Sequence, residues 1–492
     1  MTTTNNIDAG KYLLTTDMVL TTSDGKQYIL ASPKSNVKDI EVMYINIYES
    51  IEKPYILAEL NVTDVALNLI GTIPLQGMEK ITFGFKTPHF SDKEYLYDFR
   101  IYAIRDRYAD QRAQNYTIDL ISYEGLKNEA TRVGKTLIGT GDKIVQDILK
   151  NYLSADSKIK SSEFEQCKYQ MKFIPSNKKP FELIASILPK CISTSASVTV
   201  PQSTSSSTKN ITTTTRSSSS TNTPAKDSVE NLVGSAGYCF WETQEGYKFK
   251  SIDKMCSSGG NFGGSASKGT FIYQLANVEG RDPGNNILEY SYVNEIDVMQ
   301  KMRYGTYSSL MVFFNPSTGQ YEEYVFDIDK SYPKMAHLGK EEKIPDGPKE
   351  LSKYPTRIMS QLIDHETFYN GTDIASPEPK DNKSNGTSFP DFKKFYSAQS
   401  VSRTLLLGNQ QLNITLYGNL TLRAGDKIDV LLPRFVVQSK KNEGAYDTQH
   451  SGTYLIKDIS YEFHRLRGDR TNSAITNITL VRDSFGVFKL EI

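Results

Sequence analysis

The feature that most constrains the fold is an alternation of apolar and polar residues that fills much of residues 1–125. The runs DIEVMYINIY and YILAELNVTDVALNLI place Val, Ile, Leu or Tyr at nearly every second position, and YDFRIYAIRDRY and NYTIDLIS follow after polar turn residues. Such alternation, rich in β-branched and aromatic residues, predicts half-buried strands. Several short strands at this spacing predict a β-barrel or a β-sandwich.

A second β-rich region near the end of the chain contains a close copy of a motif from the first region. LQGMEKITFGFKTP (Leu75–Pro88) corresponds to LRAGDKIDVLLP (Leu422–Pro433). In each copy a glycine, Gly77 or Gly425, comes shortly before an acidic residue, Lys-Ile and a short strand that stops at a proline. Glycine permits the positive φ of a tight turn, and proline cannot donate a ladder hydrogen bond.

The other strand motifs recur in the same order. AELNVT matches QQLNIT ahead of that motif, and YDFRIYAIRDRY matches GTYLIKDISYEF behind it. Each region then closes with a further strand, YTIDLIS or NITLVRD. One such match would arise by chance, because alternation and glycine turns are common in β proteins. Three matches in one order favour an internal duplication of a small β unit.

The period changes to that of helices after the first β region. In residues 140–153, TGDKIVQDILKNYL, the apolar residues fall on one helical face, and Thr140 or Asp142 is placed to cap the start. NKKPFELIASILPKCI predicts a second helix with Pro180 in its first turn. GYCFWETQEGYKFKSID then predicts a hairpin of two aromatic-rich strands. These elements indicate an α+β middle domain.

A polar insertion divides this middle domain. Residues 193–223 contain 21 Ser or Thr among 31 positions, and such a segment buries too little apolar surface to offset its ordering entropy. We expect a flexible surface loop; the alternative is a tether that orders against a neighbouring protein. Strands resume from about residue 285, and residues 333–398 are rich in Lys, Pro and Gly with one expected short helix, PTRIMSQLIDHETF.

These patterns divide the chain into four parts within a mainly β, α+β fold. We assign residues 1–125 to a first tube-like β-barrel and residues 126–275 to the α+β middle domain with its insertion. Residues 276–332 and 395–485 are assigned to a second tube-like barrel, and residues 333–394 to an insertion with a short helix.

Composition argues against several classes of protein. The 57 basic and 57 acidic residues leave no formal net charge, whereas a general nucleic-acid-binding protein carries a basic excess. The four cysteines, Cys167, Cys191, Cys239 and Cys256, form no CxxC pair and have no zinc-finger spacing, so we expect free thiols in a reducing compartment. No signal peptide is expected, because MTTTNNIDAGKYLL has neither a basic region nor a long apolar run. No membrane anchoring is expected, because no run approaches the ~18 apolar residues that span a bilayer.

No arrangement of residues predicts a chemical site. The histidines are scattered through the sequence, at His89, His337, His365, His450 and His464. Consecutive ligands in DHE, residues 364–366, would point in different directions on a helix. GGSASKGT fails the phosphate-loop spacing, and neither GxSxG nor HExxH occurs. Because no carboxylate pair stands out either, we expect no catalytic, cofactor-binding or metal residues, no cofactor and no enzymatic activity.

The residues resemble one known family. The run LTLRAGDKIDVLLP, SGTYLIKDISYEFH and NITLVRDS, together with the aromatic hairpin GYCFWETQEGYKFKSIDKM, resembles the baseplate hub proteins of contractile-tailed bacteriophages. Those proteins are related to the N-terminal part of type VI secretion spike proteins. The resemblance covers about residues 40–330 and 395–485. The Ser/Thr-rich insertion and residues 333–398 depart from the family pattern.

The resemblance implies a structural role. Two tube-like barrels joined by α+β domains would form a homotrimeric ring with pseudo-six-fold symmetry. One face would meet the hexameric tail tube protein and the other the trimeric central spike protein, with baseplate wedge proteins around it and tape-measure protein in the lumen. The chain would be a virion component of the tail baseplate, assembled in the cytoplasm of the host bacterium. We expect Gly425→Val to strain its turn and to impair folding or trimerisation.

Two alternatives remain open. A tail-associated receptor-binding or glycan-binding protein would show measurable affinity for cell-surface glycans. A cell-wall hydrolase would cleave peptidoglycan in a zymogram, but an enzyme has no use for the duplicated β unit.

Overall fold

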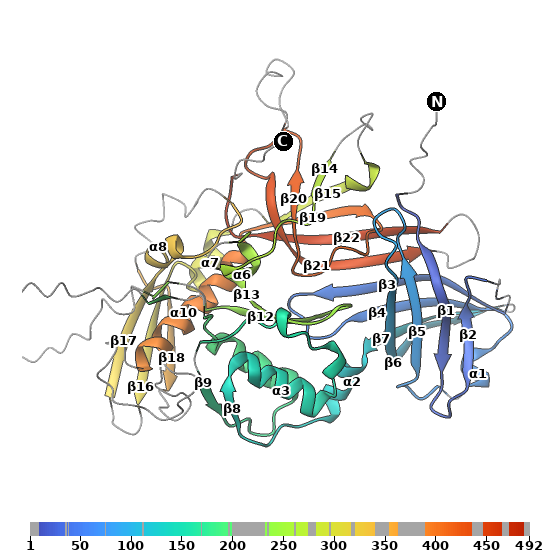
Figure 1. Cartoon of the computed structure of the whole chain (residues 1–492), viewed down its shortest axis with the longest axis horizontal. Helices are drawn as coiled ribbons and strands as arrows, with labels where there is room; N and C mark the ends of the chain where they lie inside the picture. Colours follow the sequence, from blue (N-terminus) through green and yellow to red (C-terminus); the bar gives the residue numbers. More distant parts are fainter. Residues whose placement is uncertain are drawn as a thin grey trace, which may run out of the picture.

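The computed structural model is mainly β (Figure 1). We describe it as four units: two β units, a middle unit and a small three-stranded sheet. It describes residues 9–34, 37, 39–73, 75–110, 113–168, 170–194, 197–198, 232–233, 236–259, 262–273, 282–294, 297–315, 320–339, 354–362, 389–434, 446–464 and 472–486.

The first β unit is an antiparallel sheet with strand order β2-β1-β5-β6-β7-β4-β3. Alternation in the sequence becomes alternation in burial: along β4, Ala58, Leu60 and Val62 are buried and the residues between them are partly exposed. The elements of this unit are β1 (Leu13–Thr21), β2 (Gln27–Ala31), β3 (Ile40–Ser50), β4 (Leu57–Asp64), α1 (Leu69–Thr72), β5 (Lys80–Lys86), β6 (Tyr95–Ala109) and β7 (Gln114–Ser122).

The second β unit is a closed six-stranded barrel, in which β21-β20-β14-β15-β19-β22 returns to β21. Strand β14 runs parallel to both of its neighbours, and the other pairings are antiparallel. Its elements are β14 (Thr270–Tyr273), η5 (Pro283–Asn285), β15 (Asn286–Asn294), β19 (Gln410–Tyr417), β20 (Lys427–Leu431), β21 (Gly452–His464) and β22 (Ser473–Arg482).

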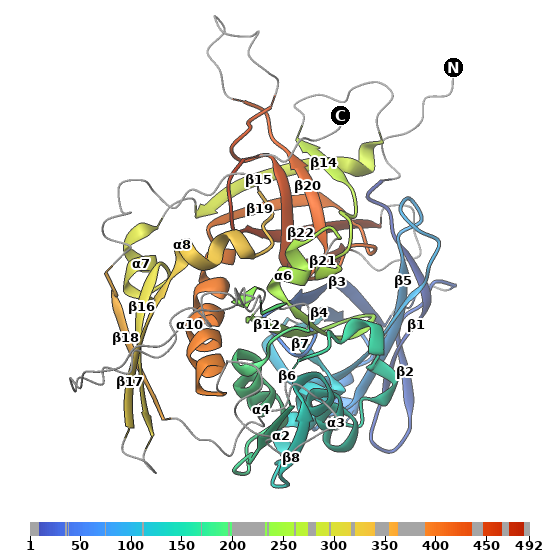
Figure 2. The same cartoon turned by 60° about the vertical axis from the view of Figure 1, so that its left-hand side comes forward.

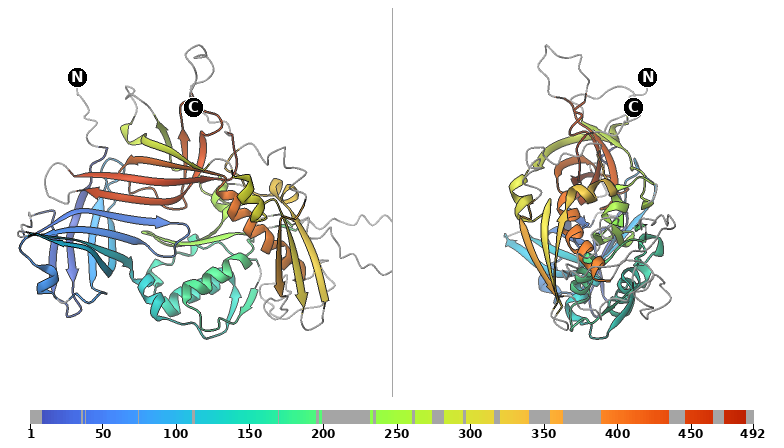
Figure 3. Two further views of the ribbon diagram at one scale, coloured as in Figure 1. Left: turned by 180° about the vertical axis from the view of Figure 1, so that it is seen from behind. Right: turned by 90° about the vertical axis from the view of Figure 1, so that its left-hand side faces the viewer.

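The two β units share one sheet and one core. Strand β3 pairs antiparallel with β21 from Ser50–Asp458 to Tyr44–His464, and the strands lie side by side in Figure 3. Buried residues of both units form a single apolar cluster. Among the described strands no ladder joins β2 to β3, although the two are in contact. The predicted pair of barrels is therefore one closed barrel continued by a sheet, because the edge of β3 that could close the first unit pairs with β21 of the barrel.

The middle unit contains the predicted helices and hairpin around a core of its own. Pro180 begins α4, as expected, and Thr140 is the N-cap residue of α3, although its side chain makes no capping hydrogen bond. Most of the Ser/Thr-rich insertion lies outside the described residues. The elements are α2 (Tyr123–Ala130), β8 (Leu137–Thr140), α3 (Gly141–Leu153), η1 (Asp156–Lys158), η2 (Ser161–Glu163), β9 (Gln170–Phe173), α4 (Pro180–Ile187), η3 (Leu188–Lys190), β10 (Ser197–Val198), β11 (Leu232–Val233), β12 (Tyr238–Thr243), β13 (Gly246–Ser251) and α6 (Ile252–Cys256).

The fourth unit is a three-stranded sheet, β17-β16-β18, with helix α10 beside it (Figure 2). Of residues 276–332, β15 lies in the barrel, whereas β16 and β17 lie in this separate sheet. The elements are α7 (Val298–Arg303), β16 (Ser308–Asn315), β17 (Gln320–Asp327), α8 (Ile328–Ser331), η6 (Tyr332–Lys334), β18 (Arg357–Leu362) and α10 (Phe389–Leu407).

Two expectations for this unit are wrong. The helix expected at PTRIMSQLIDHETF is the strand β18 over its described residues, because β16 offers it a parallel ladder from Arg357 to Leu362. Residues 395–407, assigned to the second barrel, are instead the end of helix α10. Residues 363–388, with the DHE triplet, lie outside the described part.

Five strands of each β unit follow the same pairing order. The first unit has β5-β6-β7-β4-β3 and the barrel has β20-β21-β22-β19-β15, with every neighbouring pair antiparallel. A register shift occurs at the same place, between Ile101 and Ala103 on β6 and between Ile456 and Asp458 on β21. The strands that carry the sequence motifs therefore occupy matching positions.

The turn before β5 and the turn before β20 also match in detail. Met78 and Gly425 both have positive φ, 76° and 87°. Their backbone N–H groups donate to Ile101 O at 2.7 Å and to Ile456 O at 2.9 Å. In this register Gly425 corresponds to Met78, whereas the sequence motif pairs Gly425 with Gly77. The matching hydrogen bonds show that Met78 is the structural counterpart of Gly425.

Candidate functional site: the joints between units

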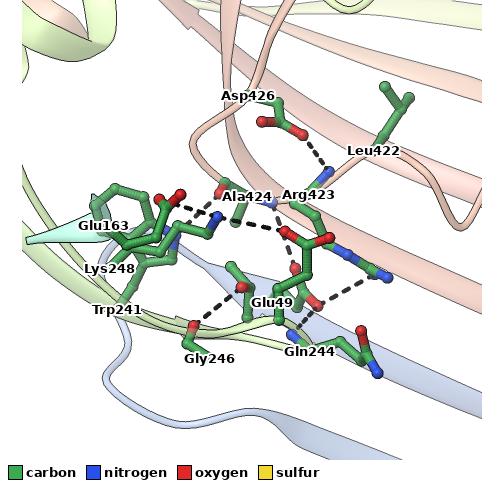
Figure 4. A network of polar contacts seen from close by, with 12 residues as sticks. Glu49, Glu163, Trp241, Gln244, Gly246, Lys248, Leu422, Arg423, Ala424 and Asp426 are labelled. Carbon is green, nitrogen blue, oxygen red and sulfur yellow. Dashed lines mark hydrogen bonds and ion pairs between the residues drawn. The ribbon is translucent and has the colours of Figure 1, made fainter. Parts of the chain in front are cut away.

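The turn of residues 422–426 before β20, the hairpin β12–β13 and the end of β3 meet in a polar network (Figure 4). We call this network the central joint. It contains Glu49, Trp241, Gln244, Arg423, Ala424, Gly425 and Asp426. Because these residues come from the first β unit, the middle unit and the barrel, the central joint fixes three units at one point.

Trp241 anchors the hairpin in the barrel. Its side chain is fully buried, and its Nε1–H donates to Ala424 O at 2.9 Å. The ring lies so close to the next residue that a Cβ on Gly425 would be 2.3 Å from Trp241 Cζ2. Gly425 is therefore required twice, by its φ of 87° and by the approach of the indole.

A buried ion pair lies at the centre of the central joint. Arg423 Nη1 is 3.4 Å from Glu49 Oε1 and donates to Tyr461 Oη at 2.9 Å. Glu49 also accepts from the backbone N–H of Gln244 at 2.9 Å. Burial raises the pKa of Glu49, and the Arg423 charge opposes this rise. Removing one partner of such a pair leaves the other charge buried and uncompensated.

A second joint connects the middle unit to the first β unit. Lys158 Nζ is 2.6 Å from Glu242 Oε1 on β12 and 2.5 Å from Glu124 Oε2 on α2. The other oxygen of Glu242 accepts from Ser122 Oγ at 2.6 Å and from Ile56 N at 3.2 Å. Burial raises the pKa of Glu242, with Lys158 acting in the opposite direction. One carboxylate therefore ties together the hairpin, the end of β7 and the start of β4.

A third joint holds α10 against α6 and the segment after β22. Arg403 Nη1 is 2.6 Å from Asp483 Oδ2, and Arg403 Nη2 is 3.1 Å from Asp253 Oδ1. His337 Nδ1 lies 2.8 Å from Asp483 Oδ2. Burial alone would raise the pKa of Asp483, but Arg403 and the hydrogen bond with His337 outweigh it and lower the pKa. Both carboxylates and the guanidinium are almost fully buried.

The joints hold the units together through buried charge pairs. Their charged groups pair with one another and with backbone groups, although some buried atoms, among them Arg423 Nη2 and Asp253 Oδ2, have no hydrogen-bond partner in the described part of the chain. The described residues contain no group of three or more side chains that could hold a metal ion. Sequence reasoning missed all three joints, since Glu49 and Arg423 are separated by 374 positions. A single signal was available: glutamate in the aromatic strand YCFWET is unusual enough to predict a buried partner.

The residues examined as possible ligands are dispersed in the structure. The histidines within the described part each face a carboxylate, at 2.7 Å for His89–Asp282, 2.8 Å for His337–Asp483, 2.6 Å for His450–Asp447 and 3.7 Å for His464–Glu462. All four cysteines are free thiols, and three of them are buried. The GGSASKGT loop enters β14. Of these residues only His337 belongs to a joint.

In the described part of the chain, no helix is both long enough and apolar enough to cross a bilayer.

Comparisons with known proteins give structural matches only. No protein-family model matches the sequence, and no curated protein matches it. A tail protein from Neisseria meningitidis MC58 is similar over 96% of this chain and 97% of its own, with 8% identity and a TM-score of 0.49. The 43 kDa tail protein of prophage MuSo2 from Shewanella oneidensis covers 95% and 99%, with 9% identity and a TM-score of 0.48.

A third similar structure, from E. coli, is a component of the type VI secretion system. It matches 92% of this chain and 76% of its own, with 9% identity and a TM-score of 0.38. The class of the similar structures and the class that the sequence resembles therefore coincide. At these identities and TM-scores the likenesses assign no function to this chain.

Proposed function

We propose that this chain is the structural hub of a contractile-tail baseplate, a virion protein without enzymatic activity. In this role a homotrimer adapts the six-fold tail tube to the three-fold central spike, surrounded by wedge proteins. The observation that carries the proposal is the five-strand pairing order shared by the two β units. Two similar units per chain give a trimer six similar positions in a ring, which is what a six-fold partner requires.

We further propose that the two β units arose by duplication. Support comes from the strand order, from the common register shift and from the turns at Met78 and Gly425. Unrelated β-sheets share alternation but have no reason to share a bulge at the same strand position.

The buried joints suit an adaptor. An adaptor transmits position from one partner to the other, so its units have to keep a fixed relative orientation. Boundaries between domains of one chain are usually polar and mobile, whereas here a continuous ladder and three buried charge clusters cross them.

Electron microscopy of the purified chain, alone and with its spike, tests the proposal. We expect three-fold particles with six similar lobes in views along the symmetry axis. A chain that stays monomeric even with the spike, and that binds cell-surface glycans on an array, would replace the hub by the receptor-binding alternative.

A further inference from the structure

The ladder between the two β units occupies a particular part of β21. The first residues of β21 pair with β20 as far as Leu455, and β22 lies along the opposite side of the strand. Beyond the end of β20, residues 458–464 pair with β3. The overhanging half of β21 is therefore where the barrel receives a strand from the first β unit.

Strand β6 has the same overhang in the first β unit. It pairs with β5 as far as Arg100, and β7 follows its opposite side to Ala109. Past Ile101 no described strand pairs with the β5 side of β6. Large side chains are exposed there: Tyr102 is 47% and Tyr108 is 65% exposed.

On β21 the overhang is covered instead. There Ile459, Tyr461 and Phe463 face the shared core. Glu462, which holds the place on β21 that Tyr108 holds on β6, pairs with β3 and is only partly exposed. The two overhangs differ in having or lacking a partner strand, although their strands hold matching positions in the pairing order.

Strand β15 of the barrel occupies the position that β3 has in the first unit. Its ladder with β14 ends at Ile287, while β19 accompanies its other side to Asn294. Glu289 and Ser291 are exposed, and Val293 is 52% exposed. The barrel therefore presents a strand edge where the first unit uses β3 to hold β21.

We propose that β15 of one copy of this chain pairs antiparallel with the overhanging half of β6 in the next copy. This inference rests on the proposed trimeric hub. In the proposed ring, one rotation places the first unit on the barrel, so that β3 falls on β15 and β6 falls on β21. The same rotation places the barrel on the first unit of the next copy, so that β21 falls on that copy's β6. The contact between β3 and β21 within one chain therefore becomes a contact between β15 and the neighbour's β6. The partner is a second copy of this chain, and the binding mode is addition of a strand to an open sheet edge.

The ladders within the chain fix the register of this contact. Ile118 and Ile478 stand opposite Ile104 and Ile459, respectively. Three residues earlier along β7 and β22, Asn115 and Ile475 stand opposite Tyr108 and Glu462, so Tyr108 on β6 corresponds to Glu462 on β21.

The register of β15 follows in the same way. The ladders equate Ser291 on β15 with Asn46 on β3, and Asn46 pairs with Glu462. Tyr108 of one copy should therefore face Ser291 of the next.

Disulfide crosslinking of the full chain tests the contact. The variant Tyr108→Cys/Ser291→Cys is oxidised mildly and run on a non-reducing gel, and its oligomeric state is measured by mass photometry, alone and with the spike. Both positions are exposed, and Trp241 fluorescence checks that the variant is folded. We expect a covalent ladder that ends at the trimer. The matched control is Tyr108→Cys/Tyr290→Cys, whose second cysteine points to the opposite face of the strand, and we expect it to yield no covalent trimer.

Each remaining outcome overturns the contact between β15 and β6, the trimeric ring on which the inference rests, or both. A non-covalent trimer without crosslinks would place the subunit contact elsewhere and leave the hub function intact. Crosslinked species that grow beyond the trimer would mean an open chain of subunits in place of a ring. A folded monomer, even with the spike present, would overturn both the contact and the proposed hub.

Discussion

Single residues decide whether the units can approach one another closely. Gly425 admits the ring of Trp241, and Arg423 and Glu49 neutralise each other where water is excluded. These positions tolerate little change, because each substitution adds either a steric overlap or an unpaired buried charge.

Gly425→Val should destabilise the folded chain strongly. The new side chain would overlap Trp241 and occupy a φ of 87° that β-branched residues avoid, so we expect a loss of about 3 kcal/mol or more. Urea unfolding followed by fluorescence of Trp241, the single tryptophan, measures it. The matched control is Gly25→Val, with φ 83° and no atom within 4 Å of its Cβ, for which we expect about 1–2 kcal/mol. Equal losses would show that the indole contact is unimportant.

Glu49→Gln should leave Arg423 without its buried counter-charge. The amide keeps the size of the carboxylate but not its charge, and we expect the free energy of unfolding to fall by about 3–5 kcal/mol. Glu52→Gln is the control: Glu52 is 3.1 Å from Lys457 and its side chain is 63% exposed, so its loss should be about 0–1 kcal/mol. If both variants unfold at the same urea concentration, the buried pair does not hold the central joint.

At the scale of elements, the third joint makes the fold sensitive to acid. Helix α10 is fixed through Arg403 to two carboxylates, one on α6 and one after β22. The pKa of Asp483 lies below its ordinary value in the folded chain. Its contribution to stability is therefore complete above the unfolded pKa of about 3.9 and is lost as the pH falls below that value.

Asp483→Asn should cost the most at neutral pH and progressively less in acid. We expect a loss of about 3 kcal/mol at pH 7. The loss should shrink as the pH falls from 5 to 3, because Asp483 is then protonated in the unfolded chain while the pKa in the folded chain lies lower. Urea unfolding at several pH values measures the difference. Asp98→Asn, which removes an exposed partner of Lys80 and Arg100, is the control and should differ little from the unmodified protein at any pH. A deficit that stays constant down to pH 3 would rule out the lowered pKa as its source.

Elements with a clear apolar period were predictable from the sequence, and those defined by their partners were not. The helices α3 and α4 and the hairpin β12–β13 have such a period. Helix α10 could not be predicted from an apolar period, because its buried residues are largely polar, among them Ser400, Ser402 and Arg403. Strand β18 was mistaken for a helix because its pattern suits both, and only its pairing with β16 decides.

The candidate site was predictable in one part only. The glycine turn at Gly425 follows from the local residue pattern. Its neighbour Trp241 and the partner of Arg423, Glu49, come from distant segments that no local pattern relates to the turn. Closure of the barrel likewise depends on β14, a four-residue strand that pairs parallel to both of its neighbours.

At the scale of the whole molecule, the two β units should behave as one body. The ladder between β3 and β21 belongs to the same thirteen-stranded sheet as the strands within each unit. Its residues are also part of the common core. Opening this contact would therefore expose apolar surface in both units at once.

Hydrogen exchange should show that unity. We expect amide protons of residues 44–50 and 458–464 to exchange as slowly as those of β22, since they open only when the whole sheet unfolds. Strand β18, an edge of the small sheet, is the internal comparison and should exchange faster. Exchange in residues 44–50 that is as fast as in β18 would mean that the two β units separate readily.

The shared ladder also determines how the molecule carries mechanical load. Seven consecutive residue pairs join β3 to β21, from Ser50–Asp458 to Tyr44–His464. A force along these strands acts on all of their hydrogen bonds in shear, so the bonds have to fail together, whereas a force across the strands peels them apart one at a time. The chain should therefore withstand a pull along β21 far better than one directed across it.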